Sequence, residues 1–235
     1  NNGSEYICYL FAGGESTAAI ARSCDFTASS MDDRLITNAS SDFQFGTGDF
    51  TIEYWFNRDG DGTYFLFDFI DPSYAQGYGQ FGTFISSGTL NFRTSGTNRI
   101  SSINTLPKGQ WHHIAVTRSS NVTRLFINGI QQGTYSDSTN YTSWNQMTIG
   151  ASNYGYATDG KISNFRVVKG TAVYTSSFRP PTEPLTNITN TKLLCCNDSS
   201  ETGTTVGTVS VPSGGTVTAS TDSPFDDPGN FVFGE

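Results

Sequence analysis

The sequence predicts an all-β protein in which two antiparallel sheets pack face to face as a jelly-roll sandwich. The composition favours strands and tight turns over helices, because Phe (18), Tyr (11) and Gly (25) are abundant while charged residues make up only 14%. Short apolar or alternating runs are separated by clusters of Gly, Asn, Asp and Ser, which is typical of strands and turns. A length of 235 residues is compatible with one sandwich domain.

Three parts follow one another along the chain. Residues 1–23 form an apolar and small-residue lead-in that contains one short strand. Regular strand signals occupy residues 24–197, where we expect the sandwich domain. Residues 198–235 are rich in Ser, Thr and Gly, so we expect an extended linker or a weakly structured tail. The start "NNGSEYICYL" carries no signal-peptide pattern, and we interpret the chain as a processed product or a window from a larger polypeptide.

The strand segments differ in how they expose their two faces. Residues 49–57 alternate, with Phe50, Ile52 and Tyr54 on one face, which predicts a strand with one side in the core. Residues 62–70 are almost continuously apolar, which predicts a strand covered on both faces. The other expected strands are, in order, 82–87, 90–94, 98–102, 112–118, 123–135, 145–152, 161–170 and 191–197. The proline-rich segment 178–185 is expected to run extended across the surface before the final strand.

The charge balance restricts the kinds of partner. With 13 basic and 21 acidic residues the net charge is −8, which repels phosphate backbones, so we expect no nucleic-acid partner. No apolar run approaches the length of about 18 residues that spans a bilayer, so we expect no membrane insertion.

Both histidines lie in one predicted strand, "WHHIAVTR", directly after Trp111. Successive side chains of a strand point to opposite faces, so His113 lies on the face of Trp111 and His112 on the face of Ile114 and Val116. The two rings therefore cannot bind one metal ion. We interpret them as buried or half-buried strand histidines held by hydrogen bonds.

The four cysteines, at positions 8, 24, 195 and 196, show no zinc-like spacing. Strand alternation predicts that Cys195 and Cys196 do not face one partner. Reduced core cysteines are the favoured interpretation. The alternative is one disulfide, from Cys24 to Cys195 or Cys196.

Several segments in succession carry a family resemblance: residues 42–57, 109–135, 147–152 and 159–197. In this order they resemble the laminin-G-like, concanavalin A-like jelly roll, over 24–197. They are most similar to the branch found in structural and tail-fibre proteins of marine bacteriophages of the cyanophage and pelagiphage type. The flanks 6–19 and 218–234 are similar to connecting pieces of mosaic virion proteins. The resemblance implies two curved sheets, loops at the rim, binding of glycans or proteins and, in many members, a calcium ion.

Some concanavalin A-like jelly rolls are glucanases, which raises glycoside hydrolysis as a possibility. In those enzymes the catalytic carboxylates alternate on one strand as Glu-x-Asp-x-Glu, and none of the six glutamates here begins such a motif. Glu53 stands alone on its strand, and Asp59 and Asp61 lie in a turn. A Gly-x-Ser-x-Gly motif is also missing from the sequence. We therefore predict that the protein is not an enzyme.

Aromatic rings among Asn, Gly and Ser in three loop-rich regions predict a glycan-binding surface. The same composition suits a protein-binding surface, and the alternative is that the rings cap the ends of the core. The predicted glycan-binding residues are Tyr141, Trp144, Asn145, Asn153, Tyr154, Tyr156, Tyr74 and Tyr78.

Acidic turns are the other candidate sites, because calcium prefers carboxylate and carbonyl oxygens. The resemblance implies a calcium ion at the rim in many members. For such an ion, the expected ligands are Asp49 in the "GTGD" turn and Asp159 before Gly160. The alternative is that these are solvated turn residues.

These expectations predict a non-enzymatic structural or adhesion module of a virion, in a tail fibre, capsid fibre or decoration protein. Its partners would be host-surface glycans, other virion proteins or copies of itself. The alternative is a carbohydrate-binding module or filament subunit of a secreted or cell-surface microbial protein. Pairing of the apolar run 6–11 with another subunit's sheet would favour assembly.

Overall fold

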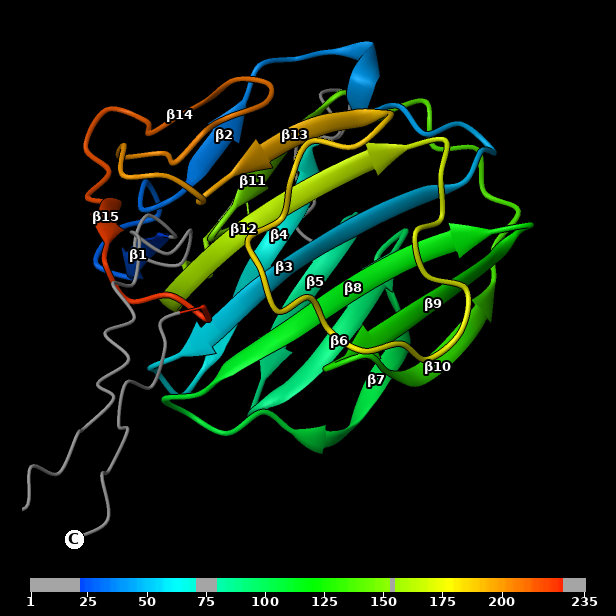
Figure 1. Cartoon of the computed structure of the whole chain (residues 1–235), viewed down its shortest axis with the longest axis horizontal. Coiled ribbons are helices and arrows are strands. Elements are labelled where there is room, and N and C mark those ends of the chain that lie inside the picture. Colours follow the sequence, from blue (N-terminus) through cyan, green and yellow to red (C-terminus); the bar gives the residue numbers. More distant parts are fainter. Residues whose placement is uncertain (1–21, 71–79, 153–154, 226–235) are drawn as a thin grey trace, which may run out of the picture.

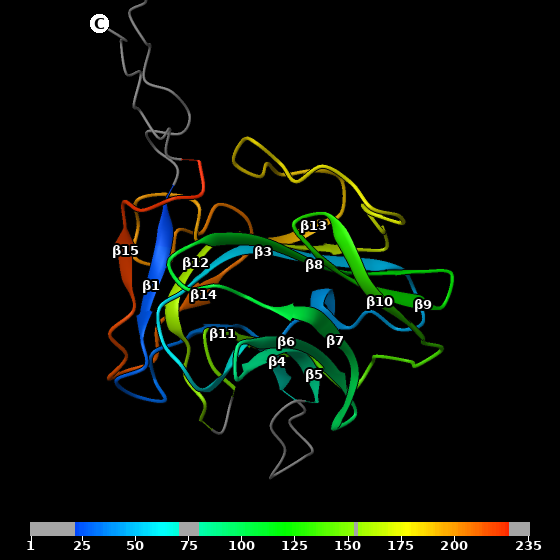
Figure 2. The ribbon, with the colours of Figure 1, turned by 90° about the horizontal axis from the view of Figure 1, so that it is seen from below.

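The computed structural model describes residues 22–70, 80–152 and 155–225, and these form two antiparallel sheets packed face to face (Figures 1 and 2). The first sheet has the order β10 (Ile130–Ser136), β9 (Val122–Ile127), β8 (Trp111–Ser119), β3 (Phe50–Arg58), β12 (Asp159–Lys169), β1 (Ser23–Thr27) and β15 (Thr218–Ser220), and β13 (Thr191–Cys195) also pairs with β12. The second has the order β14 (Val209–Ser210), β2 (Leu35–Thr37), β11 (Gln146–Ile149), β4 (Thr63–Ile70), β5 (Phe81–Ser86), β6 (Thr89–Thr94) and β7 (Thr97–Thr105). One short 3-10 helix, η1, covers Ser41–Phe43. The predicted fold class is confirmed.

The core lies between the sheets and follows the predicted alternation. Phe50, Ile52, Tyr54 and Phe56 of β3 are fully buried and face the rings of the second sheet. There β4, β5 and β6 contribute a set of edge-to-face aromatic contacts, made by Phe67, Phe69, Phe81 and Phe92. Burial of each such ring stabilises the fold by about 2 kcal/mol. The prediction that β4 is covered on both faces is also confirmed, since every residue from Tyr64 to Phe69 is buried.

The long strand predicted over residues 123–135 is wrong. It is divided into β9 and β10 by a two-residue turn, in which Asn128 and Gly129 have φ angles of +50° and +74°. Asn-Gly is the dipeptide that favours this turn, so the signal was present in the sequence. Gly129 is also required sterically, because a Cβ there would lie 1.9 Å from the carbonyl oxygen of Phe178.

The segment after residue 197 differs from the expected linker or weakly structured tail, at least as far as Phe225. It adds β14 to one sheet and β15 to the other. Phe225 is buried and packs edge-to-face on Trp55 at 5.7 Å between ring centroids. Few bulky residues are needed here, because a pre-existing sheet edge supplies the hydrogen bonds.

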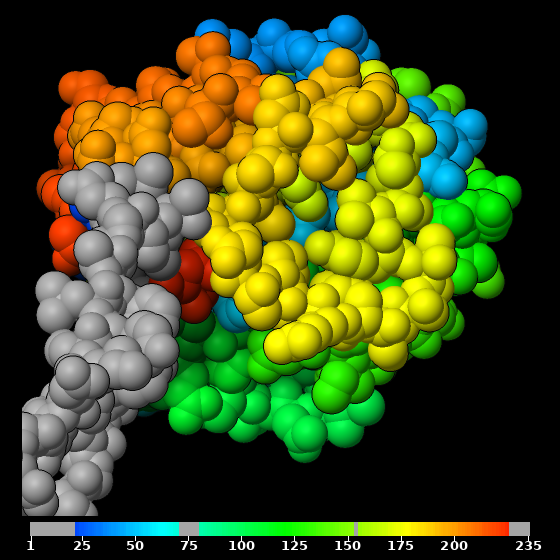
Figure 3. Space-filling model, in the orientation of Figure 1, coloured from blue at the N-terminus to red at the C-terminus, as the bar shows by residue number. Residues whose placement is uncertain are grey.

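The connection from β12 to β13, residues 170–190, crosses the outer face of the first sheet, and we call it the strap. It lies above β3, β8 and β9 in Figure 2 and covers this face in Figure 3, where it is yellow. Tyr174 and Phe178 stack within it at 3.6 Å, and the backbone N–H of Phe178 donates to the carbonyl of Gly129. Residues 178–185 form no regular strand, as their prolines predict.

Cys24, Cys195 and Cys196 are buried free thiols, so the alternative of a bond from Cys24 to Cys195 is not formed in the structure. The expectation that Cys195 and Cys196 face opposite ways is wrong. Cys196 follows the end of β13 with φ +55°, which breaks the strand alternation, and its Sγ lies 4.0 Å from that of Cys195. A hydrogen bond that Cys24 donates to Cys196, together with burial, raises the pKa of the Cys24 thiol. Cys8 lies outside the described residues.

Among the described residues, the structure contains no helix long and apolar enough to cross a membrane.

Candidate functional site

A pocket of about 250 Å³ opens at one end of the sandwich, where the start of β5, the turn between β6 and β7 and the loop 137–145 meet. We call it the rim pocket. Its lining combines uncharged polar side chains with two aromatic rings: Gln80, Ser95, Thr139, Asn140, Tyr141, Ser143 and Trp144. Amides and hydroxyls around a small hollow can hydrogen-bond the hydroxyl groups of a sugar or the backbone of a peptide.

The two rings form the floor of the rim pocket. Tyr141 and Trp144 stack at 4.9 Å with an interplanar angle of 26°, and they are only 2% and 7% exposed. Trp144 also packs against Phe81 of the core at 5.4 Å. Both rings therefore cap the end of the core, as the alternative interpretation held, and neither offers an open face for stacking. The rim pocket therefore presents the polar side chains around these rings, and no open ring face, to solvent.

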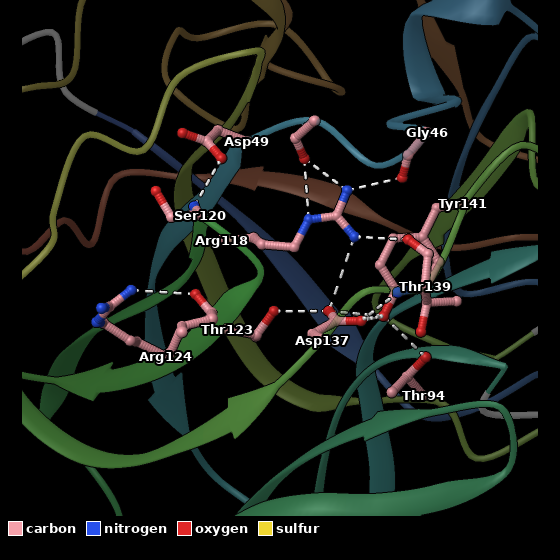
Figure 4. Close-up of polar contacts among 12 residues, drawn as sticks. Gly46, Asp49, Thr94, Arg118, Ser120, Thr123, Arg124, Asp137, Thr139 and Tyr141 are labelled. Atoms are coloured by element: carbon pink, nitrogen blue, oxygen red, sulfur yellow. Dashed lines mark hydrogen bonds and ion pairs between the residues drawn. The ribbon is translucent and has the colours of Figure 1, made fainter.

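The loop that carries most of the pocket is fixed by a buried arginine, Arg118 of β8 (Figure 4). Its Nε and Nη2 donate to the carbonyl of Gly48, Nη2 also donates to Gly46, and Nη1 donates to Thr139. Residues 46–48 and 139 come from two loops that are far apart in the sequence. One guanidinium thus joins the two loops through their carbonyl groups.

A carboxylate completes this network. Asp137 forms an ion pair with Arg118 at 3.8 Å and accepts hydrogen bonds from the hydroxyls of Tyr141 and Thr123 and from the backbone N–H of Thr139. The guanidinium also lies over the rings of Phe50 and Tyr141, 5.1 and 4.7 Å from their centroids. We call this set the arginine network. It ties the loop 137–145 to residues 46–48 and to β8.

Burial sets the protonation states in the arginine network. It lowers the pKa of Arg118, while the charge of Asp137 raises it. Burial also raises the pKa of the Tyr141 hydroxyl well above its usual value, so this group stays neutral and donates to Asp137.

Sequence reasoning predicted two pocket residues, Tyr141 and Trp144, and placed Asn140 in the same loop-rich region, but it missed the other four. Arg118 carried a usable signal, since it stands two residues after Val116 and so falls on the core-facing side of its strand. A charged side chain on the core-facing side of a strand needs buried polar or oppositely charged partners. Gln80, Ser95, Thr139 and Ser143 carried no local signal, because only the fold brings their loops together.

Other predicted glycan-binding residues lie elsewhere. Asn145 is half-buried next to the rim pocket, and its backbone carbonyl accepts from Ser40. Tyr156 is 44% exposed, but it packs near Phe65 beyond the other end of β11, so the structure does not bring it together with Tyr141. Four predicted residues lie outside the described ones: Asn153, Tyr154, Tyr74 and Tyr78.

The predicted calcium ligands do not fit a shared ion. Asp49 directly precedes β3, and Asp159 lies beside Asp59, just past the far end of β3, so the nine-residue strand separates them by roughly 30 Å. Asp49 instead accepts from the backbone N–H of Ser120. Within 22–70, 80–152 and 155–225, no three His, Cys, Asp or Glu side chains are grouped so that they could hold a metal.

A second buried polar cluster lies under the strap, on the outer face of the first sheet. Glu53 accepts from Nε and Nη2 of Arg166 at 3.0 and 2.6 Å, and from the hydroxyl of Tyr174 at 2.9 Å. It also lies 3.2 Å from Nε2 of His113. We call this set the glutamate network. Burial would raise the pKa of Glu53, but the hydrogen bond with His113 and the charge of Arg166 outweigh burial and lower it.

The glutamate network contains the residue types of a catalytic site, but its carboxylate and imidazole are closed off from a substrate. Glu53 and His113 are fully buried, and the strap covers them through Tyr174, which donates to Glu53, and Phe178, whose ring packs edge-to-face with that of His113. His113 and His112 are both buried and each ring makes a hydrogen bond, which confirms the interpretation of the histidine pair. They also face opposite sides of β8, as predicted, because only His113 reaches Glu53 on the outer face.

Comparison with protein families matches residues 30–173 to the family described as the concanavalin A-like lectin/glucanases superfamily. No sequence in a search of curated proteins matches the chain. A heptameric SAP-like pentraxin from Limulus polyphemus has a similar structure, with a TM-score of 0.53, 17% identity, and coverage of 66% of this chain and 79% of the pentraxin. A putative carbohydrate binding protein from Bacteroides ovatus has a TM-score of 0.51 and 15% identity, and the match covers 82% of this chain and 60% of that protein. At these identities the likeness concerns the fold.

Proposed function

Because the chain belongs to the concanavalin A-like lectin/glucanases superfamily, we propose that it is a non-enzymatic binding module that takes neutral glycans at the rim pocket. The observation that carries this proposal is the pocket itself, in which uncharged amides and hydroxyls surround a rigid floor. The similar structures described as a pentraxin and a putative carbohydrate binding protein support a binding role.

The charge around the pocket favours a neutral sugar over an anionic one. Each described residue that lines it is uncharged, and Arg118 of the arginine network donates to three carbonyl groups and pairs with Asp137. A sialic acid or sulfated sugar would find no positive group among the described lining residues, and the net charge of −8 would repel it.

A glycan array with the full chain tests this proposal. We expect binding to neutral glycans that Asn140→Ala and Ser143→Ala each weaken about fivefold, the value of one neutral hydrogen bond. Asn98→Ala is the matched control, since Asn98 is also exposed but lies in β7 outside the pocket. Absence of binding to every glycan, or equal binding by all three variants, would contradict the proposal.

The same array, repeated with calcium and with a chelator, tests the metal. We expect binding to persist in chelator, because Asp49 and Asp159 lie at opposite ends of β3. Loss of binding in chelator would require a calcium site that includes residues other than these two.

We further propose that the module belongs to a virion, as part of a tail fibre, capsid fibre or decoration protein that contacts other virion proteins or copies of itself. The similarity of the segment order and of the flanks 6–19 and 218–234 to marine phage structural proteins supports this location. An antibody against the chain should then label virus particles in the source material. Label on cell surfaces or in the secreted fraction would favour the alternative, a carbohydrate-binding module or filament subunit.

A further inference from the structure

Three buried thiols lie together on one side of β12, and the rim pocket does not use them: Cys24, Cys195 and Cys196. β3 pairs with one side of β12, while β1 and β13 both pair with the other, β1 opposite residues 159–162 and β13 opposite residues 165–168. The first residues of β1 therefore meet the last residues of β13 between these two stretches. Asn164 lies at this junction and donates its backbone N–H to the carbonyl of Cys196.

The sulfur of Cys196 is the centre of the group. It accepts hydrogen bonds from the thiol and from the backbone N–H of Cys24, and it lies 4.0 Å from the sulfur of Cys195. Two cysteines can form a disulfide without a large backbone movement only when their side chains point toward one another. The contact between the thiols of Cys24 and Cys196 meets this condition.

Cys24 is a better disulfide partner for Cys196 than the adjacent Cys195. A bond between residues 195 and 196 would close a small ring around one peptide unit, where the preferred disulfide geometry is reached only with strain. A bond from Cys24 to Cys196 joins two strands and closes a long loop, from β1 to the end of β13. In the chain-entropy model, the stabilisation by a cross-link grows with the length of the loop that it closes.

A short exposed loop covers the thiols. The sulfur of Cys24 lies 3.5 Å from the carbonyl oxygen of Glu201, and the backbone N–H of Cys196 donates to Thr202. Residues 199–201 are exposed, so displacement of this one loop brings Cys24 within reach of a small molecule from solvent. A hydrogen bond to Cys196 and burial raise the pKa of the Cys24 thiol, so the thiolate is scarce and the reaction is slow while the loop is in place.

We propose that Cys24 and Cys196 form a disulfide when the folded chain meets a small-molecule disulfide, and that this bond fastens β1 to the end of β13. The Cys24 thiolate attacks one sulfur of the small disulfide and expels one small thiol. The Cys196 thiolate then attacks the sulfur of Cys24 and expels the second. Two electrons pass from the protein thiols to the small disulfide, and both protons end on the released thiols.

The medium around the chain decides the state of this pair. A reducing cytosol keeps the thiols free, whereas an oxidising medium outside the cell favours the bond. The sandwich would therefore be cross-linked only after the chain leaves the cell. The bond is separate from the rim pocket, so the proposal does not depend on glycan binding.

Oxidised glutathione tests the proposal on the full chain. Folded protein is incubated with it, the remaining thiols are alkylated, and the peptides are mapped by mass spectrometry without reduction. We expect a cross-link between Cys24 and Cys196, with Cys195 alkylated. We also expect a melting temperature about 10 °C above that of the reduced chain, which dithiothreitol reverses. Alkylation of every cysteine, a lasting glutathione adduct, a bond to Cys8 or Cys195, or a cross-link without a higher melting temperature would overturn the proposal.

Two matched variants locate the bond, because they remove adjacent buried thiols. Cys195→Ser should keep the cross-link and the rise in melting temperature, whereas Cys196→Ser should lose both. Equal cross-linking of Cys24 in the two variants would contradict the assignment to Cys196. Circular dichroism checks that each variant is folded, and the peptide map of the unmodified chain remains a complete test if one of them is not.

Discussion

The arginine network and the glutamate network are both buried ion pairs attached to the same sheet, but they organise different kinds of surface. Arg118 directs most of its donors to backbone carbonyls of two loops, beside an open pocket. Glu53 gathers donors from side chains of β12 and the strap, and from the neighbouring His113, under a covered face.

The difference shows that a buried charge is not by itself a mark of function. The glutamate network has the more enzyme-like composition, yet it fastens the strap to the sheet. The arginine network consists of structural contacts, yet it positions the loop that forms the rim pocket. Access to solvent, and not the chemistry of the charged group, separates a candidate site from a structural support.

The largest effect is expected from Arg118→Met. The variant leaves Asp137 buried without its cation and removes the Arg118 donors from the carbonyl groups of Gly46, Gly48 and Thr139, so we expect a loss of about 4 kcal/mol of unfolding free energy. Urea denaturation followed by tryptophan fluorescence measures it. Arg124→Met is the matched control, because Arg124 is half-exposed on β9 and donates only to Val122, and its change should stay within about 0.5 kcal/mol. Equal losses of unfolding free energy in Arg118→Met and Arg124→Met would contradict the structural role assigned to Arg118.

Glu53→Gln should cost somewhat less, about 3 kcal/mol, because the amide keeps an acceptor oxygen while Arg166 loses its counter-charge. If the glutamate network only supports the fold, this variant should bind glycans with the same affinity as the unmodified chain, at temperatures where it is folded. Glu201→Gln, at an exposed position, is the control for loss of one carboxylate. A loss of glycan binding in Glu53→Gln alone would show that the strap side contributes to the site.

A third buried carboxylate, Asp33, predicts a pH dependence. Burial would raise its pKa, but hydrogen bonds from Ser29, Thr216 and Thr27 outweigh burial and lower the pKa to about 2. Because the folded-state pKa is the lower one, the stabilisation is present above the unfolded value of about 3.8 and is lost as pH falls through about 2.

We therefore expect Asp33 to contribute about 2 kcal/mol at neutral pH, lost progressively between about pH 5 and pH 2. Urea denaturation at a series of pH values measures this, and Asp33→Asn should remove the Asp33 part of the slope. Asp42→Asn is the control at a more exposed carboxylate. If Asp33→Asn kept the full slope, other carboxylates would be responsible for the acid sensitivity.

The smallest effect on stability is expected at the rim pocket itself. Asn140→Ala removes an exposed side chain, so the unfolding free energy should change by no more than about 0.5 kcal/mol. Thermal unfolding measures it beside the glycan array. A large destabilisation would mean that Asn140 supports the loop, and a loss of binding could then not be assigned to contact with the ligand.

The fold class and most of the core follow from local patterns in the amino-acid sequence. The period of two that places Phe50, Ile52 and Tyr54 on one face is a local property, and strand geometry converts it directly into a buried surface. The predicted interpretation of the histidine pair followed from the same rule. The Asn128-Gly129 turn was also locally encoded, since its positive φ angles suit those two residues.

The side chains and carbonyl groups that lie together at the rim pocket and around Arg118 are brought there by the tertiary fold. The rim pocket joins Gln80, Ser95 and the loop 137–145, and Arg118 joins carbonyls about 70 residues before it to one 21 residues after it. These contacts depend on which strands pair and on the path of the loops that connect them, and local periodicity carries no information about either. The segment 198–225 makes the same point: its composition predicts a tail, but the open edges of β1 and β2 give it hydrogen-bond partners that only the assembled sandwich provides.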